Sequence, residues 1–417
     1  MLQYLRLRNV GPASEMEIEF APRINVLTGD NGLGKSFLLD VAWWALTRTW
    51  SGNPALPRSP KRASISYAVR GKTGAAKPEV SEYRAAKEEW PAPAKRPAIP
   101  GIVVYARIDG GFSVWDPARN YWRSDTDRPA AYHFDNRQLW EGLKHGDVEV
   151  CEGLERDWVS WQKGGDPQFK SLVEVLRGLA PPAEKLSPGP PRKLRLAEGR
   201  ERPTIDTPAG NVHVAIASAG IRRILGLAYL LVWAWHSHIE AAKFLGKKPE
   251  KRIILLIDEP ETHLHPAWQR QIIPSLMRVV EVLAASHDTK TQVVFTTHAP
   301  LVLASLEAVF SPDLDAWSDL DLVEKGASHV VQLERRPFIR QGDASAWLMS
   351  RAFDLRSPGS VEAERILDEA ATALSNPKFD RGQAGLLQEK LRKVLSDTDP
   401  FWVRWRFVGE RKGWLPS

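Results

Sequence analysis

Apolar and polar positions alternate along the first thirty residues in the way that β-strands alternate. Strands are predicted at residues 2–8, 15–20 and 24–28. A glycine-rich turn follows the third strand, and residues 35–48 then have the apolar spacing of a helix. A unit of strand, glycine loop and helix is therefore expected near the start of the chain.

The pattern changes over the next hundred and fifty residues. Residues 51–100 are rich in Pro, Ala, Gly, Lys and Arg, and alternating pieces such as 63–69 suggest edge strands joined by mobile loops. A strand is expected again at 102–106. Residues 139–179 place Leu, Trp, Val and Phe at helical spacing and end at Ala180-Pro-Pro182, where proline stops a helix. This segment is predicted to be an inserted helical subdomain.

The second half of the chain returns to alternating strands and helices. The expected elements are a Pro-rich link at 187–192, strands at 193–196 and 212–216, a long helix at 221–244, and strands buried on both faces at 253–257 and 292–296. After Pro300 we expect one more helix and strand, a Trp/Asp-rich stretch, and a helical tail over about 361–395.

These elements predict an α/β fold with a mixed or parallel central sheet, N-terminal antiparallel strands and an inserted helical subdomain. The predicted divisions are 1–138 for the N-terminal half of the core, with a β-rich insertion at about 51–100, then 139–190 for the helical insertion, 191–340 for the C-terminal half of the core, and 341–417 for a helical tail.

Composition excludes several classes of protein. The 43% of hydrophobic and 26% of charged residues are ordinary for a globular protein. The single cysteine, Cys151, excludes an intramolecular disulfide and a cysteine-based zinc cluster and fits a reducing compartment. The N-terminus has no signal-peptide pattern, and the most apolar run, 224–235, is shorter than the about 20 residues of a membrane-spanning helix. A cytoplasmic protein without membrane contact is expected.

Charge and aromatic content permit contact with nucleic acid without indicating it. The net charge of +6 is a small excess of 57 basic over 51 acidic residues. Five basic residues could form a DNA-binding face or a solvated charged surface: Arg6, Arg8, Arg58, Lys61 and Arg62. Four tryptophans lie in apolar segments, where core packing is the expected role: Trp43, Trp44, Trp233 and Trp235.

The segment Gly29-Asp-Asn-Gly-Leu-Gly-Lys-Ser36 fits the G-x-x-x-x-G-K-[ST] pattern of a phosphate-binding loop, and it lies between a strand and a helix as that loop requires. Its glycines let backbone N–H groups turn toward phosphates. The residues predicted to bind ATP here are Asn31, Gly32, Gly34, Lys35 and Ser36. Lys35 supplies a positive charge to the β- and γ-phosphates, and Ser36 a hydroxyl ligand for Mg²⁺.

Two later strands end in polar residues that complete such a site. The run 253–257 ends in Asp258 and Glu259, at the strand end where nucleotide sites of parallel sheets lie. Asp258 would help to hold Mg²⁺ through water, and Glu259 would be the general base for the attacking water. The run 292–296 leads to His298, which is expected to reach the γ-phosphate from the same edge. Turn chemistry and a structural histidine are the alternative interpretations.

Ser218-Ala-Gly220 stands before the long helix and about 40 residues before the acidic pair. Serine, glycine and a helix N-terminus suit anion binding. The alternative is that Ser218 is an ordinary N-cap. Its spacing and order favour the anion-binding interpretation.

The order of these motifs resembles the ATPase heads of the ABC superfamily, and most of all the soluble branch that includes SMC, RecF-like and OLD-type ATPases. The stretch Glu259-Pro-Glu-Thr-His-Leu-His-Pro266 is similar to the segment that follows the acidic pair in that branch. The resemblance covers 1–50 and about 200–310, and it implies a P-loop head of the ABC type. It further implies a homodimer or higher homo-oligomer, in which Ser218 and Gly220 of one subunit close over the γ-phosphate bound to the other.

The family also has a glutamine that senses Mg²⁺ and the γ-phosphate at the join to the helical insertion, and Gln138 is the candidate here. No heptad region separates the halves, so a long-armed SMC machine is not expected. The whole chain, including 222–231, looks like standalone ATPases of bacterial anti-phage systems such as the Septu type. Those ATPases work with a separately encoded nuclease, often of the HNH kind, which implies such an effector as a partner.

Three functions remain open at this point. The first is an ATPase that regulates an effector. The second is a module in which nucleotide stabilises an assembly with little hydrolysis, and the third is a DNA-maintenance ATPase of the RecF-like type. A further alternative, cleavage of nucleic acid by the chain itself, would use Asp313, Asp315, Asp319 and Asp321, which are better interpreted as a solvated acidic loop. In the tail, Trp402, Trp405 and Trp414 could bind a partner, and core packing is expected for at least two of them.

Overall fold

The structure is a computed structural model and describes residues 1–59, 62–71, 78–92, 98–120, 129–284, 289–325 and 328–414. The chain forms two compact units, Met1–Gly342 and Asp343–Ser417. The boundary lies close to the start of the predicted tail at residue 341. The finer predicted boundaries at 138/139 and 190/191 fall inside the first unit and stay predictions.

A mixed sheet forms the centre of the first unit. Its strands, in spatial order, are β17 (Ser328–Arg336), β16 (Asp315–Lys325), β3 (Ile24–Gly29), β15 (Lys290–Thr296), β14 (Arg252–Ile257), β6 (Ile102–Ala106), β7 (Phe112–Trp115) and β8 (Tyr132–Phe134). The strands from β16 to β6 run parallel, and antiparallel strands flank them on both sides. Every residue of β14 is buried, as its continuous apolar run predicted. The predicted α/β class with a mixed central sheet is confirmed.

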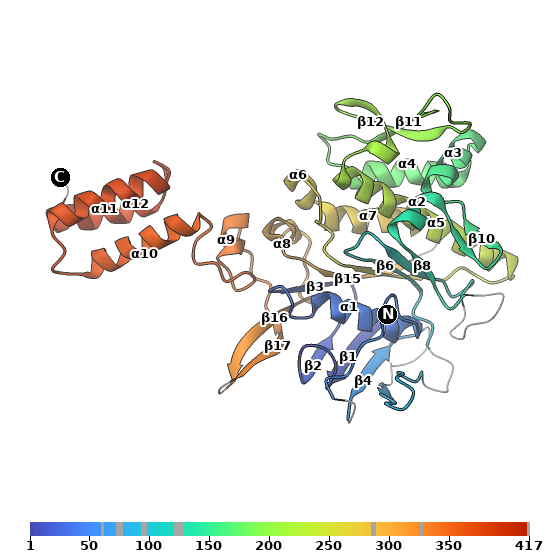
Figure 1. The fold of residues 1–417 in the computed structure, drawn as a ribbon, viewed down its shortest axis with the longest axis horizontal. Helices are drawn as coiled ribbons and strands as arrows, with labels where there is room; N and C mark the ends of the chain where they lie inside the picture. Colours follow the sequence, from blue (N-terminus) through green and yellow to red (C-terminus); the bar gives the residue numbers. More distant parts are fainter. Residues whose placement is uncertain are drawn as a thin grey trace. The chain divides into compact units, whose positions relative to one another are not determined.

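A second, antiparallel sheet lies against the first helix. Its order is β2 (Glu15–Glu19), β1 (Leu2–Arg8), β4 (Ser64–Val69) and β5 (Glu79–Glu82). Helix α1 (Lys35–Thr47) lies between this sheet and the central one, and its Trp43 and Trp44 are fully enclosed in the shared core. Figure 1 shows α1 and these strands on one side of the central sheet and the larger helices on the other. The prediction that 63–69 is an edge strand is wrong, because β5 pairs with its outer side.

Helices cover the other face of the central sheet. They are α2 (Asn136–Glu141), α3 (Leu154–Gly164), α4 (Pro167–Leu179), α5 (Ala219–Phe244), α6 (Pro266–Gln269), α7 (Ile272–Ala284) and α8 (Pro300–Leu306). Helix α5 carries the apolar run 224–235, which is buried throughout, including Trp233 and Trp235. None of the helices in the described part of the chain has both the length and the apolar character of a membrane span.

The predicted helical insertion contains strands as well as helices. A hairpin of β9 (Leu143–His145) and β10 (Val148–Cys151) separates α2 from α3, and a small sheet follows α4. That sheet has the order β11 (Ser187–Arg192), β12 (Arg202–Thr207) and β13 (Gly210–His213).

The Pro-rich segment 187–192 is therefore a strand and not a link, and the strand predicted at 193–196 is absent from these described residues. Prolines are tolerated in β11 because it is an edge strand, where one side needs no hydrogen-bond donors. The strand predicted at 212–216 ends at His213, since Val214–Ile216 form a 3-10 turn.

The second unit consists of α9 (Ala344–Leu348), α10 (Val361–Ser375), α11 (Arg381–Val394) and α12 (Phe401–Arg411). The segment 361–395, predicted to be helical, forms the two helices α10 and α11, and Pro377 lies in the break between them, where it cannot donate a helical hydrogen bond. Trp405 and Trp414 lie in the core of this unit, which confirms the prediction that at least two tail tryptophans are packed inside.

The insertion holds a buried acid that makes stability depend on pH. Asp157 on α3 accepts a hydrogen bond from the Tyr229 hydroxyl at 2.6 Å. Burial, with Glu152 and Glu149 nearby, raises the pKa of Asp157 to about 6. Because the folded state holds this proton more tightly than the unfolded chain does, stability falls as pH rises from about 4 to 6.

We expect Asp157→Asn to stabilise the fold at pH 8 by about 2 kcal/mol, since the amide still accepts from Tyr229 and carries no buried charge. At pH 4 the difference should disappear. Urea unfolding at both pH values measures this, with the exposed Asp313→Asn as the control. Equal stabilities of Asp157→Asn and the wild type at pH 8 would contradict the prediction.

Candidate functional site

The phosphate-loop residues form a turn between β3 and α1. Gly32 and Gly34 have φ values of 79° and 104°, which residues with a β-carbon rarely adopt. Asp30, Asn31 and Gly32 are exposed, so the loop opens to solvent. The Lys35 ammonium lies inside the turn, where it donates to the carbonyl oxygens of Gly29 at 2.7 Å and Asp30 at 2.9 Å. The loop thus surrounds a cation that an anion can approach from outside.

Lys35 is a largely buried cation among carboxylates. Lys35 is only 6% exposed. This burial lowers the pKa of its ammonium group. Glu259, Asp258 and Asp30 act in the opposite direction and favour the charged form. A desolvated ammonium with acidic neighbours gains more from a polyphosphate than an exposed lysine would.

The acidic pair follows β14 at the same edge of the sheet. Asp258 is 1% exposed, and its Oδ1 accepts a hydrogen bond from the Thr296 hydroxyl at 2.6 Å. The same hydroxyl oxygen accepts from the backbone N–H of Glu259 at 3.0 Å. Glu259 has a φ of 47°, in the left-handed region, so the chain turns sharply after Asp258 and directs the two carboxylates differently. Thr296 therefore joins β15 to both acids, a role that the sequence did not indicate.

His298 lies next to Glu259, as the strand order predicts. Its Nε2 is 3.4 Å from Glu259 Oε1. Burial, and then the charge of Lys35, lowers the pKa of His298, so the imidazole is neutral at pH 7. The buried Glu261 positions this turn, because its Oε1 accepts from the Thr297 hydroxyl at 2.7 Å and from the His298 N–H at 2.8 Å. Burial raises the pKa of Glu261.

The residues predicted to hold Mg²⁺ have suitable donors. Ser36 and Asp258 offer hydroxyl and carboxylate oxygens, the hard ligands that Mg²⁺ prefers. A carboxylate as deeply buried as Asp258 also requires a compensating positive charge, which the cation would add to that of Lys35. The donor set therefore fits the ion.

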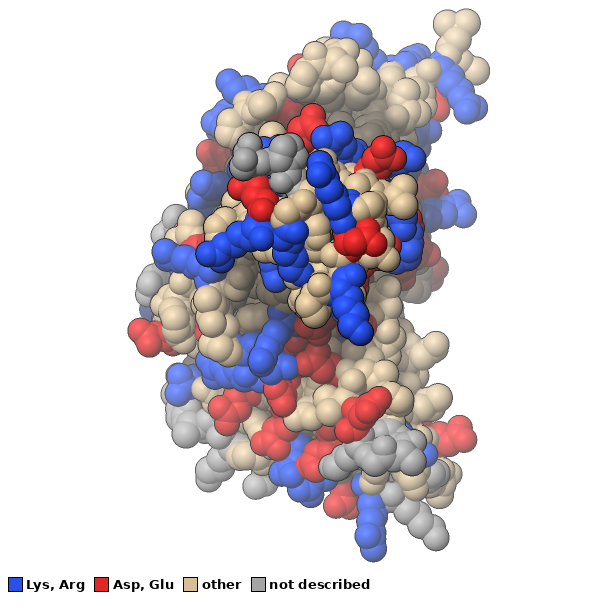
Figure 2. Space-filling model, turned by 90° about the vertical axis from the view of Figure 1, so that its left-hand side faces the viewer, with Lys and Arg blue, Asp and Glu red and all other residues tan. Residues whose placement is uncertain are grey.

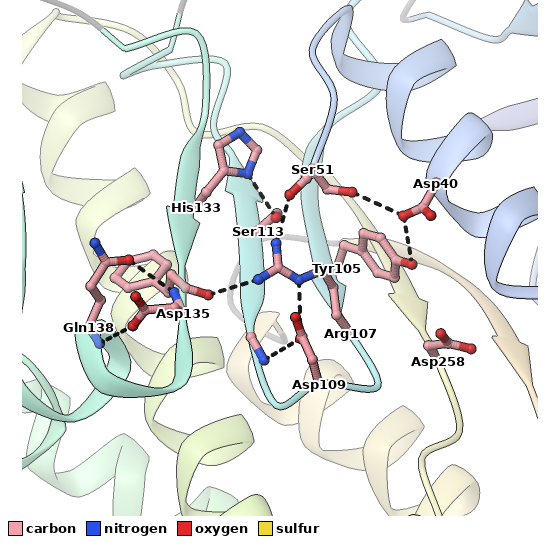
Figure 3. Close-up of polar contacts among 12 residues, drawn as sticks. Asp40, Ser51, Tyr105, Arg107, Asp109, Ser113, His133, Asp135, Gln138 and Asp258 are labelled. Atoms are coloured by element: carbon pink, nitrogen blue, oxygen red, sulfur yellow. Dashed lines mark hydrogen bonds and ion pairs between the residues drawn. The ribbon is translucent and has the colours of Figure 1, made fainter. Parts of the chain in front are cut away.

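Gln138 lies on α2 and caps its own helix. Its N–H donates to Asp135 Oδ1 at 2.7 Å, and its Oε1 accepts from the Asp135 N–H at 3.0 Å. In Figure 3 Arg107 lies between Gln138 and Asp258. The side chain amide is thus used within the helix, and its predicted role toward Mg²⁺ and the γ-phosphate stays a prediction.

Arg107, at the end of β6, occupies the position beside the acidic pair. The Asp258 N–H donates to the carbonyl of Ala106 at 2.9 Å, so Arg107 follows directly at this edge. Its guanidinium donates to the Ser51 carbonyl at 2.7 Å and is 3.3 Å from Asp109 (Figure 3). The sequence contained a signal for Arg107, because 102–106 is an apolar strand that ends in a charged residue, as 253–257 does.

Arg223 ties α5 to the same edge. Its guanidinium donates to the carbonyl oxygens of Arg107 at 3.4 Å, Asp258 at 3.1 Å and Glu259 at 3.3 Å. The pair Arg222-Arg223 was visible beside the Ser-x-Gly motif, but these backbone contacts depend on folding and could not be inferred from the sequence.

A hydrogen-bonded acid supports the phosphate-loop helix from behind. Asp40 Oδ1 accepts from the hydroxyls of Ser51 and Tyr105, both at 3.1 Å, and Figure 3 shows Tyr105 between Asp40 and Asp258. Burial raises the pKa of Asp40. These bonds join α1 to β6.

Ser218 and Gly220 begin α5 at the surface. Ser218 Oγ accepts from the Ile221 N–H at 3.4 Å, so the residue caps the helix as the alternative interpretation predicted. Ser218 and Ala219 are nevertheless exposed. A β-carbon at Gly220 would lie 2.6 Å from the carbonyl oxygen of His263, which explains the glycine by close backbone approach. Capping does not exclude contact with a second subunit.

Three of the four acids of the Trp/Asp-rich stretch belong to β16, and Asp313 precedes this strand. Asp315 is 1% exposed and pairs with Arg23 through two hydrogen bonds, at 2.9 and 2.5 Å. Asp319, also 1% exposed, accepts from the Thr28 hydroxyl. The prediction of a solvated acidic loop is wrong for Asp315 and Asp319, because parallel pairing with β3 draws them into the sheet. Asp313 lies in an exposed turn, as predicted.

Part of the predicted basic face is neutralised within the chain. Arg6 and Arg8 pair with Glu15, and Arg58 donates to the Pro12 carbonyl. Lys61 lies outside the described residues. Figure 2 likewise shows basic and acidic side chains intermixed on the face turned to the viewer.

Two segments of the chain match known families. Residues 207–304 match the family described as "AAA domain, putative AbiEii toxin, Type IV TA system", and residues 4–89 match the family described as "AAA domain". These segments carry Ser218, Gly220, Asp258, Glu259 and His298 in the first case and the phosphate loop in the second.

A curated relative and several solved structures are similar to the chain. It is 25% identical over 162 residues to the Retron Ec83 probable ATPase of Escherichia coli, a match that covers 39% of this chain and 26% of that protein. The SMC head domain from Thermotoga maritima is 14% identical with a TM-score of 0.39, covering 81% of this chain and 99% of that chain. The recombination mediator protein RecF-ATP is 12% identical with a TM-score of 0.36, covering 81% and 97%.

Proposed function

We propose that this chain, an ABC-type ATPase by its fold and its AAA-domain matches, hydrolyses ATP between two copies of itself in the cytoplasm and thereby regulates a separately encoded effector. The carrying observation is the convergence of the phosphate loop, the acidic pair and His298 at one edge of the parallel strands β3, β15 and β14. The match to a retron probable ATPase supports the ATPase activity.

Each residue of the site has a distinct part in the proposed reaction. Ser36 and Asp258 would hold Mg²⁺, which would supply positive charge to the phosphates. Lys35 binds the β- and γ-phosphates, and the N–H groups from Asn31 to Gly34 surround them. A water oxygen attacks the γ-phosphorus while Glu259 takes the water proton, and the bond to the bridging oxygen of ADP breaks.

His298 suits a supporting role beside the general base. Because its lowered pKa keeps the imidazole neutral, Nε2–H can donate a hydrogen bond to Glu259 or to the γ-phosphate without adding a charge. Glu261 and Thr297 hold the turn that carries it.

The proposal of a dimer rests on residues of the site that are exposed to solvent. Asn31 and Gly32 of the loop are exposed, and so are Ser218 and Ala219 at the N-terminus of the 26-residue helix α5. A second copy could place that helix end, with its partial positive charge, against the γ-phosphate. The effector is proposed to be a nuclease, often of the HNH kind in the systems that the sequence resembles. The matched family's description names a toxin–antitoxin system, which favours a chain that acts with a second component.

We expect Ser218→Arg to keep ATP binding by the single chain but to abolish ATP-dependent dimerisation and to lower turnover at least about 100-fold, because a bulky cation would occupy the interface. Light scattering with and without Mg-ATP, and phosphate release, measure the two effects. Ser160→Arg on the exposed surface of α3 is the matched control. A Ser218→Arg variant that still dimerises and hydrolyses ATP would refute the facing-dimer arrangement.

A further inference from the structure

Strand β16 lies directly beside the strand that enters the phosphate loop. In the parallel register Asp319 is opposite Thr28, and Leu320 is opposite Gly29. The contact is close, because a β-carbon at Gly29 would lie 2.3 Å from the Leu320 carbonyl oxygen. Gly29, with a φ of 127°, thus begins the loop against the backbone of β16. Figure 1 shows the hairpin β16–β17 beside β3.

The hydroxyl of Thr28 is held from two sides by this strand. It donates to Asp319 Oδ1 at 2.5 Å and accepts from the Trp317 indole N–H at 2.7 Å. Thr28 is 0% and Asp319 1% exposed, so water does not compete for these bonds. The last side chain before the phosphate loop is therefore fixed in one orientation.

The fixed position of Thr28 also affects the next residue, Gly29, which begins the loop. The carbonyl of Gly29, the residue after Thr28, accepts a hydrogen bond from the Lys35 ammonium at 2.7 Å. A change in the Thr28 backbone would turn that carbonyl and move the ammonium with it. Asp319, Thr28, Gly29 and Lys35 thus form one connected series.

Strand β17 places a cation near Asp319. The Arg336 guanidinium lies 3.8 Å from Asp319 Oδ2 and also pairs with Asp321 and, at 2.7 Å, with Glu334. The cation reduces the repulsion that a buried carboxylate would exert on a phosphate.

We propose that Asp319 is a positioning residue of the ATP site, which through Thr28 holds the entry of the phosphate loop in its binding geometry. The inference rests on the proposed function, since it concerns nucleotide binding at that site. Neither the phosphate-loop motif nor the acidic pair includes Asp319, and its spacing of 284 residues from Lys35 is bridged only by the sheet.

Variants from both sides of the hydrogen bond test this role. Asp319→Ala and Thr28→Val should each raise the KM for Mg-ATP and the Kd for the fluorescent analogue mant-ADP roughly tenfold, with kcat changed less than about threefold. Asp319→Asn keeps an oxygen acceptor for Thr28 and should recover most of the affinity. The double variant Asp319→Ala/Thr28→Val should be no worse than either single one, because both remove the same bond.

Asp321→Ala is the matched control, since Asp321 is also on β16 and pairs with Arg336 of β17 but lies beyond the residues that β3 pairs with. Its KM and Kd should stay within about twofold of wild type. Equal losses in Asp321→Ala and Asp319→Ala, or unchanged affinity in Thr28→Val, would overturn the positioning role while leaving the ATPase proposal intact. Absence of nucleotide binding by the wild type would instead overturn both.

Discussion

The Glu259→Gln variant should bind ATP as the wild type does but hydrolyse it about 10³-fold more slowly, because an amide cannot accept the proton of the attacking water. Glutamine keeps the shape of the side chain and an oxygen that can accept the Thr262 hydroxyl, which lies 3.4 Å from Glu259 Oε2. The variant should therefore accumulate as an ATP-bound dimer. Phosphate release, mant-ATP binding and light scattering with Mg-ATP measure the three properties.

Glu261→Gln provides the contrast for this experiment. Glu261 is buried and lies two residues away, and its Oε1 accepts hydrogen bonds from Thr297 and His298, both of which glutamine can still accept. We expect its turnover to fall less than about tenfold. Turnover by Glu259→Gln within tenfold of wild type would exclude Glu259 as the general base, whereas absence of turnover by the wild type itself would favour an assembly that ATP stabilises without chemistry.

Much of the core could be predicted because its signals are local. β1, α1 and α5 have clear periodicities, and β14 is a continuous apolar run, so their bounds agree with prediction to within a few residues. The phosphate loop and the acidic pair followed from spacing alone. Their meeting at one sheet edge followed from the rule that parallel strands present their carboxyl ends together.

The errors occur where pairing across the sequence decides the structure. The prolines of β11 favour a link, but pairing with β12 makes an edge strand. The acidic residues of β16 favour a loop when the sequence is considered alone. Once β16 pairs with β3, Arg23 pairs with Asp315, and the Thr28 hydroxyl donates a hydrogen bond to Asp319. Arg23 and Thr28 are far from these acids in the sequence, so composition alone favoured solvent exposure of the acids.

Contacts between residues far apart in the sequence also explain why two residues of the site were not predicted. Thr296 and Arg223 act on the acidic pair through a hydroxyl and a guanidinium whose partners are backbone or buried atoms. Motifs name side chains that face the ligand and omit those that orient them. Gln138, at the expected join, caps its own helix, and its predicted role toward Mg²⁺ and the γ-phosphate stays a prediction.

Replacing Lys35 by methionine should weaken nucleotide binding at least about 100-fold while preserving the fold. The ammonium is the only lysine or arginine group that the described contacts place inside the phosphate loop, bonded to the Gly29 and Asp30 carbonyls. Loss of its bonds to two phosphates should cost about 3 kcal/mol or more, which is a 100-fold or greater rise in Kd. Titration with mant-ATP measures this rise directly.

Measurements of stability distinguish the loss of a contact with the nucleotide from damage to the fold of the site. Because burial lowers the pKa of Lys35, the folded state bears a desolvation cost for this charge, and methionine of similar length removes that cost. The unfolding midpoint of Lys35→Met without nucleotide should therefore equal or exceed that of the wild type, whereas added Mg-ATP should stabilise only the wild type. Lys390→Met, which removes an exposed lysine paired with Glu369, should keep the full ATP-dependent stabilisation. If Lys35→Met still gained stability from Mg-ATP, the nucleotide would be bound elsewhere and the phosphate loop would have to be assigned another ligand.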